Sequence, residues 1–243
     1  MREARITAQL QHPNTVPVYE LGKDADGKLF FAMKKVEGEN LFQVLVRIAQ
    51  GEESTKQQYS LDRLLGVLIL ASSALAYAHS RGVIHRDVKP ENILLGPFGE
   101  VYLMDWGVAK VWGMAAEAES EVPVEELYQR LTATGKRAGT PLYMSPEQIN
   151  EWPIECNSNL FSLGSVLYEM LTGVRPFKSD SLTKITHNIT NEKPLPLSEF
   201  RSDLPEGLDY VLSRMLKKKN SKRYSMGLDV AADLTLIYDD LEK

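Results

Sequence analysis

Cysteine is nearly absent from this sequence of 243 residues: Cys156 is the only one. A single cysteine cannot close an intrachain disulfide, so the composition favours a reducing compartment or a protein indifferent to redox conditions. Metal sites built on several thiolates are excluded for the same reason. The 4 histidines are scattered, and no His or Cys cluster has the spacing of metal ligands.

The sequence also lacks an apolar leader and a long apolar run. Residues 1–14 are charged and have no apolar core of the kind that a signal peptide needs, so secretion by that route is not expected. The most apolar stretch, residues 64–78, falls short of the ~18 to 20 apolar residues of a bilayer span and contains two serines. We therefore expect a buried helix there, no membrane segment in this chain, and a cytoplasmic location.

An excess of positive charge is missing too. The 28 Lys and Arg residues face 33 Asp and Glu residues, which gives a formal net charge of −5 and a pI of about 5.5. This balance argues against a nucleic-acid partner, because nonspecific affinity for nucleic acid comes mainly from a basic surface. The hydrophobic content of 43% and the charged content of 25% exclude disordered, collagen-like and coiled-coil chains, and the length predicts one large or two small domains.

Two β-hairpins are predicted. Residues 15–21 and 28–36 are rich in Val, Tyr and Phe and flank a polar turn, and residues 93–95 and 101–104 flank the turn Gly-Pro-Phe-Gly. A short amphipathic helix is predicted over residues 1–10, before the first hairpin. The strands therefore belong to the N-terminal part of the chain and to one short segment near its middle.

Helical periodicity dominates the rest of the sequence. It predicts helices over residues 41–49, 61–81, 159–171, 182–190, 208–216 and 228–241. Residues 51–60 are predicted to form a polar loop, and residues 112–136 are too long and irregular for an ordinary connection. The expected architecture is a small strand-containing piece followed by a larger helical piece, with the joint at residues 36–40.

Residues 85–92, with the sequence His-Arg-Asp-Val-Lys-Pro-Glu-Asn, carry the chemistry that stands out most. They lie between a buried helix and a hairpin, in a rigidly anchored loop of the kind that often holds catalytic groups. Phosphoryl transfer needs an acceptor for a hydroxyl proton, a cation and oxygen ligands for Mg²⁺, and Asp87, Lys89 and Asn92 supply one of each. Asp105 follows a strand directly, so we expect it to join Asn92 in a magnesium site.

Four segments in order resemble the protein kinase superfamily, in particular bacterial eukaryotic-like serine/threonine kinases. Residues 85–92 resemble the catalytic loop, and Asp-Trp-Gly at 105–107 resembles the Asp-Phe-Gly motif. Residues 139–144 resemble the substrate-facing end of the activation segment, and Ser-Pro-Glu at 145–147 resembles Ala-Pro-Glu. Lys89 within the catalytic loop favours serine/threonine over tyrosine kinases.

The resemblance implies a role for each matching residue. Asp87 would be the catalytic base, Lys89 would steady the γ-phosphate of ATP, and Thr140 would orient both. The remaining implied roles are Mg²⁺ ligands (Asn92 and Asp105), the turn after the metal-binding aspartate (Gly107), the helix-C glutamate (Glu3), the gatekeeper (Met33), the adenine-binding hinge (Lys34, Lys35 and Val36), the floor of the nucleotide pocket (Leu94) and a buried ion pair (Glu147 with Arg223).

Two regulatory or structural features also follow from the resemblance. An arginine next to the catalytic aspartate, here Arg86 beside Asp87, resembles the arrangement in kinases that are switched by phosphorylation of the activation loop. Thr132 and Thr134 are the nearest candidate phosphorylation sites, although both threonines can equally remain unmodified. Asn159 takes the place of the family's helix-F aspartate. Its amide can still accept a hydrogen bond from the catalytic-loop backbone, without the strength that a carboxylate adds.

The sequence departs from the family pattern at its beginning. Residues 1–10 resemble helix C, and no Gly-x-Gly-x-x-Gly loop or Val-Ala-Ile-Lys strand occurs in the sequence. The expectation is an α+β, protein-kinase-like bilobal fold with a truncated N-lobe sheet and a complete, mainly helical C-lobe. Residues 1–36 would form the partial N-lobe and residues 37–243 the hinge exit and C-lobe, with an activation segment at 105–147.

Two functions are compatible with these features. The first is a serine/threonine kinase domain that uses ATP and Mg²⁺ and takes a protein Ser/Thr hydroxyl as substrate. The second is a noncatalytic, pseudokinase-like fragment that binds a partner or serves as a scaffold. In this case we expect the partner to associate with the exposed edge of the N-lobe sheet. Simpler interpretations are preferred elsewhere: His12 and His79 as helix-end or packing residues, and the lysines at 217–219 as a solvated helix end.

Overall fold

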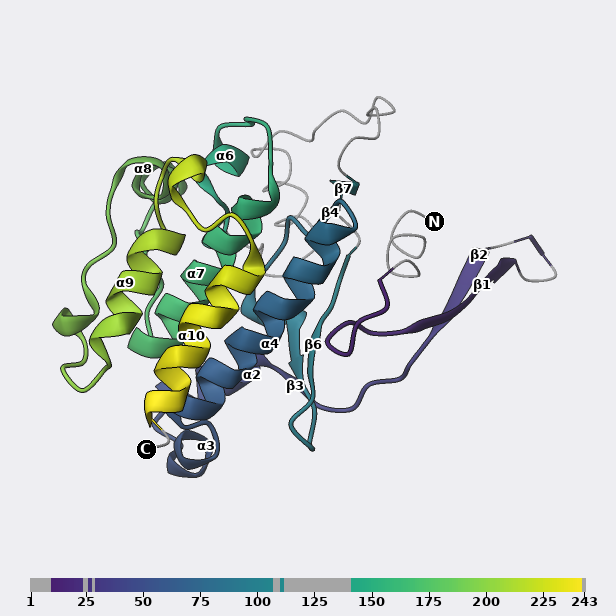
Figure 1. The fold of residues 1–243 in the computed structure, drawn as a ribbon, viewed down its shortest axis with the longest axis horizontal. Helices are drawn as coiled ribbons and strands as arrows, with labels where there is room; N and C mark the ends of the chain where they lie inside the picture. Colours follow the sequence, from purple (N-terminus) through teal and green to yellow (C-terminus); the bar gives the residue numbers. More distant parts are fainter. Residues whose placement is uncertain (1–9, 24–25, 28, 107–109, 112–140, 242–243) are drawn as a thin grey trace.

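The computed structural model of the chain describes residues 10–23, 26–27, 29–106, 110–111 and 141–241. The helix predicted over residues 1–10 and the long segment at 112–136 lie largely or wholly outside these ranges. In the described part, a strand-containing region and a larger helical body lie side by side (Figure 1). This is an α+β fold with a small sheet region and a helical lobe, as expected from the sequence.

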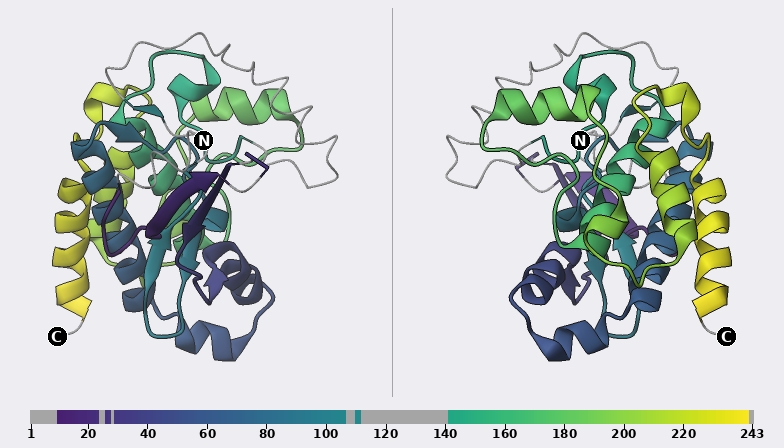
Figure 2. Two further views of the ribbon diagram at one scale, coloured as in Figure 1. Left: turned by 90° about the vertical axis from the view of Figure 1, so that its right-hand side faces the viewer. Right: turned by 90° about the vertical axis from the view of Figure 1, so that its left-hand side faces the viewer.

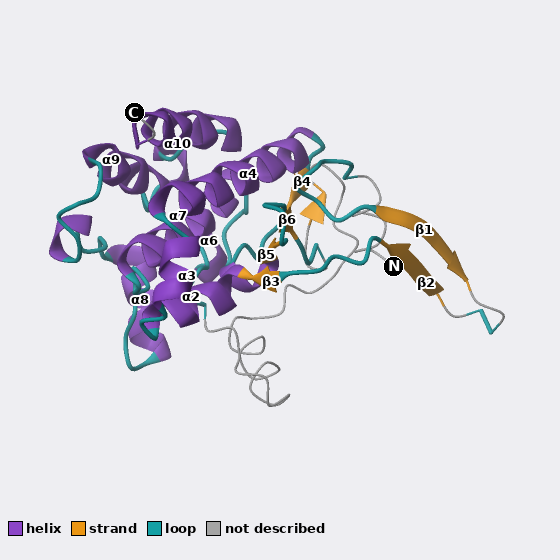
Figure 3. Ribbon diagram, turned by 90° about the horizontal axis from the view of Figure 1, so that it is seen from below, coloured by secondary structure: helices purple, strands orange, loops and turns teal. Residues whose placement is uncertain are grey.

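The first predicted hairpin is confirmed. Strands β1 (Val18–Lys23) and β2 (Leu29–Met33) pair antiparallel in a two-stranded sheet, and the hairpin projects from the helical body (Figures 1 and 3). Both strands are shorter than predicted. Thr15 forms a parallel bridge with Leu103 instead of joining β1, because the segment before β1 is anchored to the body.

The second hairpin is confirmed as well. Strands β3 (Glu39–Asn40), β5 (Ile93–Leu95) and β6 (Val101–Leu103) form an antiparallel sheet in the order β3-β5-β6. Gly38 precedes β3 with a φ of 144°, and a Cβ at this position would collide with the carbonyl oxygen of Leu95. Only glycine lets the chain pass so close to β5 at the joint.

Six predicted helices are confirmed, with ends that shift by up to three residues. They are α2 (Leu41–Ala49), α4 (Leu61–Ser80), α7 (Cys156–Thr172), α8 (Leu182–Asn191), α9 (Glu206–Met215) and α10 (Gly227–Leu241). Helix α4 packs against α7 and α10 in the centre of the helical body (Figures 1 and 2). At Gly227 a Cβ would lie 2.5 Å from the carbonyl oxygen of Ser72, so glycine allows α10 to approach α4 closely.

Several short elements complete the described chain. These are α3 (Glu53–Gln58), α6 (Pro146–Ile149), the strand pair β4 (Val83–Ile84) and β7 (Lys110–Val111), and the 3-10 helices η1 (Pro90–Asn92), η2 (Leu197–Glu199) and η3 (Asn220–Lys222). Strand β4 ends directly before His85, and helix α6 carries Gln148, which donates to the backbone carbonyl of Arg86. They therefore set the position of the site.

The polar loop predicted over residues 51–60 is wrong, because α3 occupies most of it. This helix has no apolar stripe, and polar contacts hold it in place. Lys56 pairs with Glu53 at 2.7 Å, and the buried Thr55 hydroxyl accepts a hydrogen bond from Arg47 at 3.1 Å. A search for hydrophobic periodicity passes over such a helix.

The burial predicted for residues 64–78 is confirmed, since α4 has ten buried residues, eight of which belong to the hydrophobic core. Among the described residues, α4 alone is long and apolar enough to cross a membrane by length and composition, and 56% of its most apolar window is buried. Leu65, Leu68 and Leu75 are fully buried. Helices α7 and α10 of the same chain cover part of the apolar surface of α4.

Candidate active site

His85 fixes the start of the loop at 85–92. Its ring is fully buried and packs against Trp106, with ring centroids 4.4 Å apart. Nδ1 accepts a hydrogen bond from the backbone N–H of Asp87 at 3.3 Å, so the ring proton lies on Nε2, which donates to the carbonyl oxygen of Met104 at 2.8 Å. Burial lowers the pKa of His85, which suits a neutral ring that ties the loop to the end of β6.

The structure brings Asp87, Lys89 and Asn92 together. Lys89 Nζ lies 2.5 Å from Asp87 Oδ2, and Asn92 Nδ2 donates to the same oxygen at 3.1 Å and to the backbone carbonyl of Asp87 at 2.7 Å. The Asp87 side chain is 35% exposed, so its carboxylate faces solvent while its backbone is held. A carboxylate held in this way can accept a proton from a bound hydroxyl group.

Asp105 enters from the end of β6. Its φ of 59° is in the left-handed region, which costs free energy for a non-glycine residue and often marks a functional position. The backbone N–H of Met104 donates to the carbonyl of Asn92 at 2.8 Å, so the residues preceding Asp105 are tied to Asn92. Burial lowers the pKa of His85, and the carboxylates of Asp87 and Asp105 act in the opposite direction.

The donor set suits a magnesium ion with substrate phosphates. Asn92 uses its amide nitrogen on Asp87, which leaves its amide oxygen as a ligand, and Asp105 adds a carboxylate. Mg²⁺ takes oxygen ligands and is commonly held by one or two carboxylates together with phosphate oxygens. Among the described residues no cluster of three or more His, Cys, Asp or Glu could hold a metal by itself. The residues present fit a shared protein-and-phosphate site.

Both backbone polar groups of Arg86, which lies between His85 and Asp87, form hydrogen bonds to side chains. Its backbone N–H donates to Asn159 Oδ1 at 3.0 Å, as predicted for this asparagine, and its carbonyl accepts from Gln148 Nε2 at 2.8 Å. Its φ of 71° requires such support. Gln148 was not identified from the sequence, although the capping box that it forms with Ser145 at the start of α6 was a signal for it.

Asn159 also contacts His79. Its Nδ2 lies 2.9 Å from His79 Nε2, so His79 accepts with a neutral ring. Burial lowers the pKa of His79 to about 4. The prediction of a packing histidine at the end of α4 is confirmed for His79, and the hydrogen bond adds a link from α4 through α7 to the catalytic loop.

Glu147 and Arg223 form a buried, two-bonded ion pair. Arg223 Nη1 and Nη2 lie 2.5 and 2.9 Å from the two carboxylate oxygens, and Ser158 donates to Glu147 at 2.6 Å. Burial acts to raise the pKa of Glu147, but the bonds from Arg223 and Ser158 outweigh it and the pKa is lowered. The pair joins α6 to the segment before α10.

The predicted nucleotide-binding residues lie at the joint between the two sheets. Lys34 Nζ donates to Tyr102 Oη at 2.8 Å, and Tyr102 pairs with Leu94 between β6 and β5. Lys35 forms an exposed ion pair with Glu37, and Met33 is 47% exposed at the end of β2. Val36 is half-buried. Glu3, Gly107, Thr132, Thr134 and Thr140 lie outside the described residues.

Lys218 corrects the prediction of a solvated lysine run. Lys217 and Lys219 are exposed, but Lys218 is half-buried and its Nζ donates to the carbonyls of Asn188 and Ile189 at 3.1 and 2.6 Å. Burial lowers the pKa of Lys218 to about 7. The side chain closes the end of α8, a contact between distant segments that a run of three lysines does not reveal.

A second group missed from the sequence surrounds Tyr143. Its hydroxyl donates to Glu169 on α7 and accepts from Arg175 Nε at 3.3 Å, and Arg175 lies 3.4 Å from Glu169. Burial raises the pKa of Tyr143, so the hydroxyl stays protonated. The group anchors residues 141–144 to the helical body.

Comparison with known proteins decides the family. Residues 1–233 match the protein kinase domain. The chain belongs to the protein kinase family. It is 34% identical over 244 residues to the serine/threonine-protein kinase PknD of Protochlamydia amoebophila, which covers 96% of the chain and 25% of that protein. It is also 35% identical over 240 residues to PknD of Chlamydia pneumoniae, covering 96% of the chain and 26% of that protein.

A third relative, PknD of Chlamydia caviae, is 34% identical over 240 residues, covering 96% of the chain and 26% of that protein. The chain thus spans about a quarter of the length of the curated relatives it matches. These relatives are serine/threonine kinases by name, and the family is one of transferases. The resemblance noted in residues 85–92, 105–107 and 139–147 is therefore a true family relationship of this kinase domain.

Proposed function

We propose that this kinase domain transfers the γ-phosphoryl group of ATP to a Ser or Thr hydroxyl of a protein substrate. The observation that carries the proposal is the position of Asp87, whose carboxylate faces solvent while Lys89 and Asn92 contact it. The hydroxyl oxygen forms the new bond to phosphorus, the bond from phosphorus to the β-γ bridging oxygen breaks, and the hydroxyl proton goes to Asp87. ADP is the leaving group.

Other residues of the chain would bind the phosphates and the metal ion and hold the loop in position. Lys89 bears a positive charge next to Asp87 and would meet the transferred phosphoryl group, which carries spread negative charge. Asn92 and Asp105 would hold Mg²⁺, which when bound neutralises charge on the phosphates. The backbone of the loop at 85–92 is held by hydrogen bonds to His85, Gln148 and Asn159. The side chains of Asp87, Lys89 and Asn92 therefore project from a backbone that is fixed in position.

The nucleotide would lie against the joint between the two sheets. In this proposal the backbone of Lys34, Lys35 and Val36 contacts adenine, Met33 borders the pocket, and Leu94 forms its floor. The contact of Lys34 with Tyr102, opposite Leu94, supports this placement because it draws the joint against the β5–β6 hairpin. The roles of Thr140, and of Thr132 and Thr134 as phosphorylation sites, stay predictions, as does the cytoplasmic location.

A noncatalytic, partner-binding domain is the second candidate. It is favoured by the projecting β1–β2 hairpin, where Tyr19 is 69% and Phe30 41% exposed. A two-stranded sheet has open backbone groups on its edges and favours association. Lys34 and Lys35, which follow β2, contact Tyr102 and Glu37 respectively.

Two measurements separate these functions. The first is MgATP binding by calorimetry, with Asp105→Ala as the variant that removes a metal ligand. The second is transfer of radiolabelled phosphate to a general protein substrate, with Asp87→Asn compared with Asp180→Asn, a matched change at an exposed position away from the site. The kinase proposal expects binding that Asp105→Ala weakens, and transfer that Asp87→Asn abolishes and Asp180→Asn preserves. Undiminished transfer by Asp87→Asn would sink the assignment of the base.

A further inference from the structure

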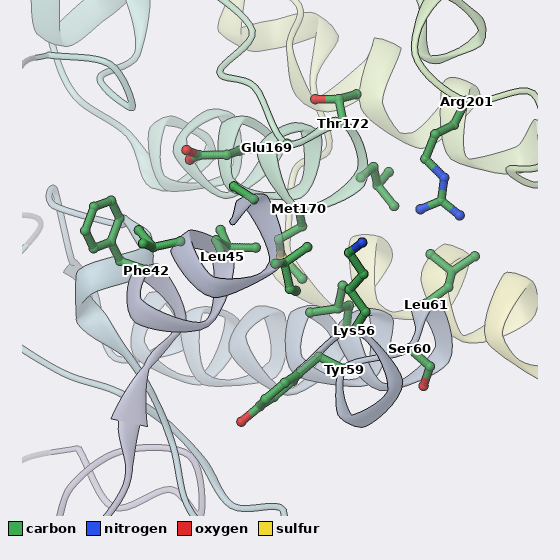
Figure 4. Close-up of a pocket in the computed structure, with 16 residues that line it drawn as sticks. Phe42, Leu45, Lys56, Tyr59, Ser60, Leu61, Glu169, Met170, Thr172 and Arg201 are labelled. Carbon is green, nitrogen blue, oxygen red and sulfur yellow. The ribbon is translucent and has the colours of Figure 1, made fainter. Parts of the chain in front are cut away.

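A pocket of about 580 Å³ lies in the helical body, apart from the Asp87 site (Figure 4). Helix α2, the start of α4, the end of α7 and Arg201 enclose it. Its volume is within the range of about 300 to 1,000 Å³ that small-molecule sites occupy. None of the residues placed in phosphoryl transfer lines this pocket, so it requires its own explanation.

The walls of the pocket are largely apolar. Three helices contribute them, chiefly through Leu45, Ile48, Leu61, Leu64 and Met170. The lining also includes Tyr59, Ser60 and Thr172, but its apolar part cannot satisfy the backbone N–H and C=O groups of an inserted peptide, which would lose hydrogen bonds to water. A hydrocarbon chain has no such groups, and the flexible thioether of Met170 can adapt to its shape.

Positive charge gathers on one side of the pocket. Figure 4 shows Lys56 and Arg201 near Leu61, whereas Phe42 and Glu169 lie toward the opposite side. Lys56 pairs with Glu53 at 2.7 Å and Arg201 with Asp203 at 2.6 Å, and all four groups are well exposed. Exposed ion pairs contribute little free energy, so both cations can turn to an anionic ligand at small cost.

The acid on the opposite side does not repel such a ligand. Glu169 accepts a hydrogen bond from Tyr143 and pairs with Arg175 at 3.4 Å, so its charge is compensated within the protein. The pocket therefore combines mainly apolar walls with one side on which Lys56 and Arg201, held in exposed ion pairs with Glu53 and Asp203, can be drawn to an anionic group. This pattern is complementary to a molecule with one anionic head and one apolar chain.

We propose that this pocket binds a fatty acid, with its chain between α2, α4 and α7 and its carboxylate beside Lys56 and Arg201. Each buried methylene contributes free energy up to the length at which the pocket is full. Affinity should therefore rise along the series octanoate, decanoate and laurate and then level off. The proposal does not depend on phosphoryl transfer, and binding is measured without nucleotide.

The first test is calorimetric titration of the full chain with laurate below its micelle concentration and with methyl laurate. The ester keeps the apolar chain but has no charge. We expect about a tenfold weaker binding of the ester, because it cannot form charge-assisted hydrogen bonds with Lys56 and Arg201. Equal affinities for acid and ester would overturn the proposal.

Variants then locate the site. Ala49→Trp fills the pocket from the exposed end of α2 and removes no buried group, so laurate affinity should fall at least about tenfold. Lys56→Met with Arg201→Met should lower laurate affinity to that of the ester and leave the ester unchanged. The matched control, Lys217→Met with Lys219→Met, removes two exposed charges elsewhere and should bind laurate as the wild type does.

Two other outcomes count against the proposal. Unchanged laurate binding by Ala49→Trp would show that the acid adsorbs outside this pocket. If the protein sediments with phosphatidylglycerol vesicles but does not bind monomeric laurate, the residues around the pocket form a membrane-contacting surface instead. Circular dichroism of each variant checks that the helices are intact.

Discussion

Asn159 on α7 accepts a hydrogen bond from the backbone N–H of Arg86 at 3.0 Å, one residue before the candidate base Asp87. The carbonyl of the same Arg86 accepts from Gln148 on α6. An amide therefore supports the catalytic loop where most members of the family are expected to have a carboxylate. The loop depends on neutral hydrogen bonds, and their removal should affect both stability and transfer.

Replacing Asn159 tests this support. Asn159→Leu keeps similar volume but leaves the Arg86 N–H without an acceptor, so the free energy of unfolding should fall by about 1 to 3 kcal/mol. Asn159→Asp restores an acceptor with a stronger, charge-assisted bond and should recover the stability. Urea denaturation measures the free energy, and phosphate transfer measures the effect on the site. Wild-type stability in Asn159→Leu would contradict the role given to this bond.

The buried pair of Glu147 and Arg223 should respond very differently to single and double changes. Arg223→Met leaves the Glu147 carboxylate buried without its cation, which typically costs about 3 to 5 kcal/mol. Adding Glu147→Gln removes the stranded charge and should recover part of the loss. Denaturation of the two single variants and the double variant completes the cycle, and strictly additive losses would show that the two side chains do not stabilise each other.

His79 should make the protein sensitive to acid. Its pKa is about 4 in the folded chain against 6.5 in the unfolded chain, because burial disfavours the charged ring. Between these values the unfolded state binds more protons, so stability is full above pH 6.5 and falls as the pH drops toward 4, by at most about 3 kcal/mol from this group. His79→Gln should show a shallower loss in urea midpoints from pH 7 to pH 4.5. Parallel curves for the two proteins would exclude His79 as the cause.

Lys218 should make the stability of the protein rise with pH above neutrality. Burial lowers its pKa to about 7 from 10.5, so between these values the unfolded state binds the additional proton and stability rises with pH. Lys218→Met removes the amine that caps α8 and abolishes this rise, whereas Lys217→Met, at an exposed neighbouring position, retains it. Thermal unfolding between pH 7 and pH 10 distinguishes the two, and identical pH slopes for both variants would contradict the assignment.

The elements that could be predicted are those with a strong local signal. The Val, Tyr and Phe content of the segments around a polar turn indicated β1 and β2, and the apolar spacing of α2, α4 and α10 indicated these helices and their approximate bounds. Helix α3 was missed because Lys56, Glu53 and Thr55 stabilise it through polar contacts. Gln148 and Tyr143 were missed because their partners, Arg86 and Glu169, lie far away in the sequence.

The sequence alone determined the family, since the spacing of Asp87, Asn92 and Asp105 within an ordered series of motifs depends only on chain order. It also determined the helical character of most of the chain, because apolar periodicity is a local property. Only the tertiary structure decided which polar groups contact each other across distant segments of the chain. Lys218 reaches the end of α8, Asn159 reaches the Arg86 backbone, and Lys56 and Arg201 line the same pocket. Such contacts arise when packing buries polar groups, which must then find partners in whatever segment lies beside them.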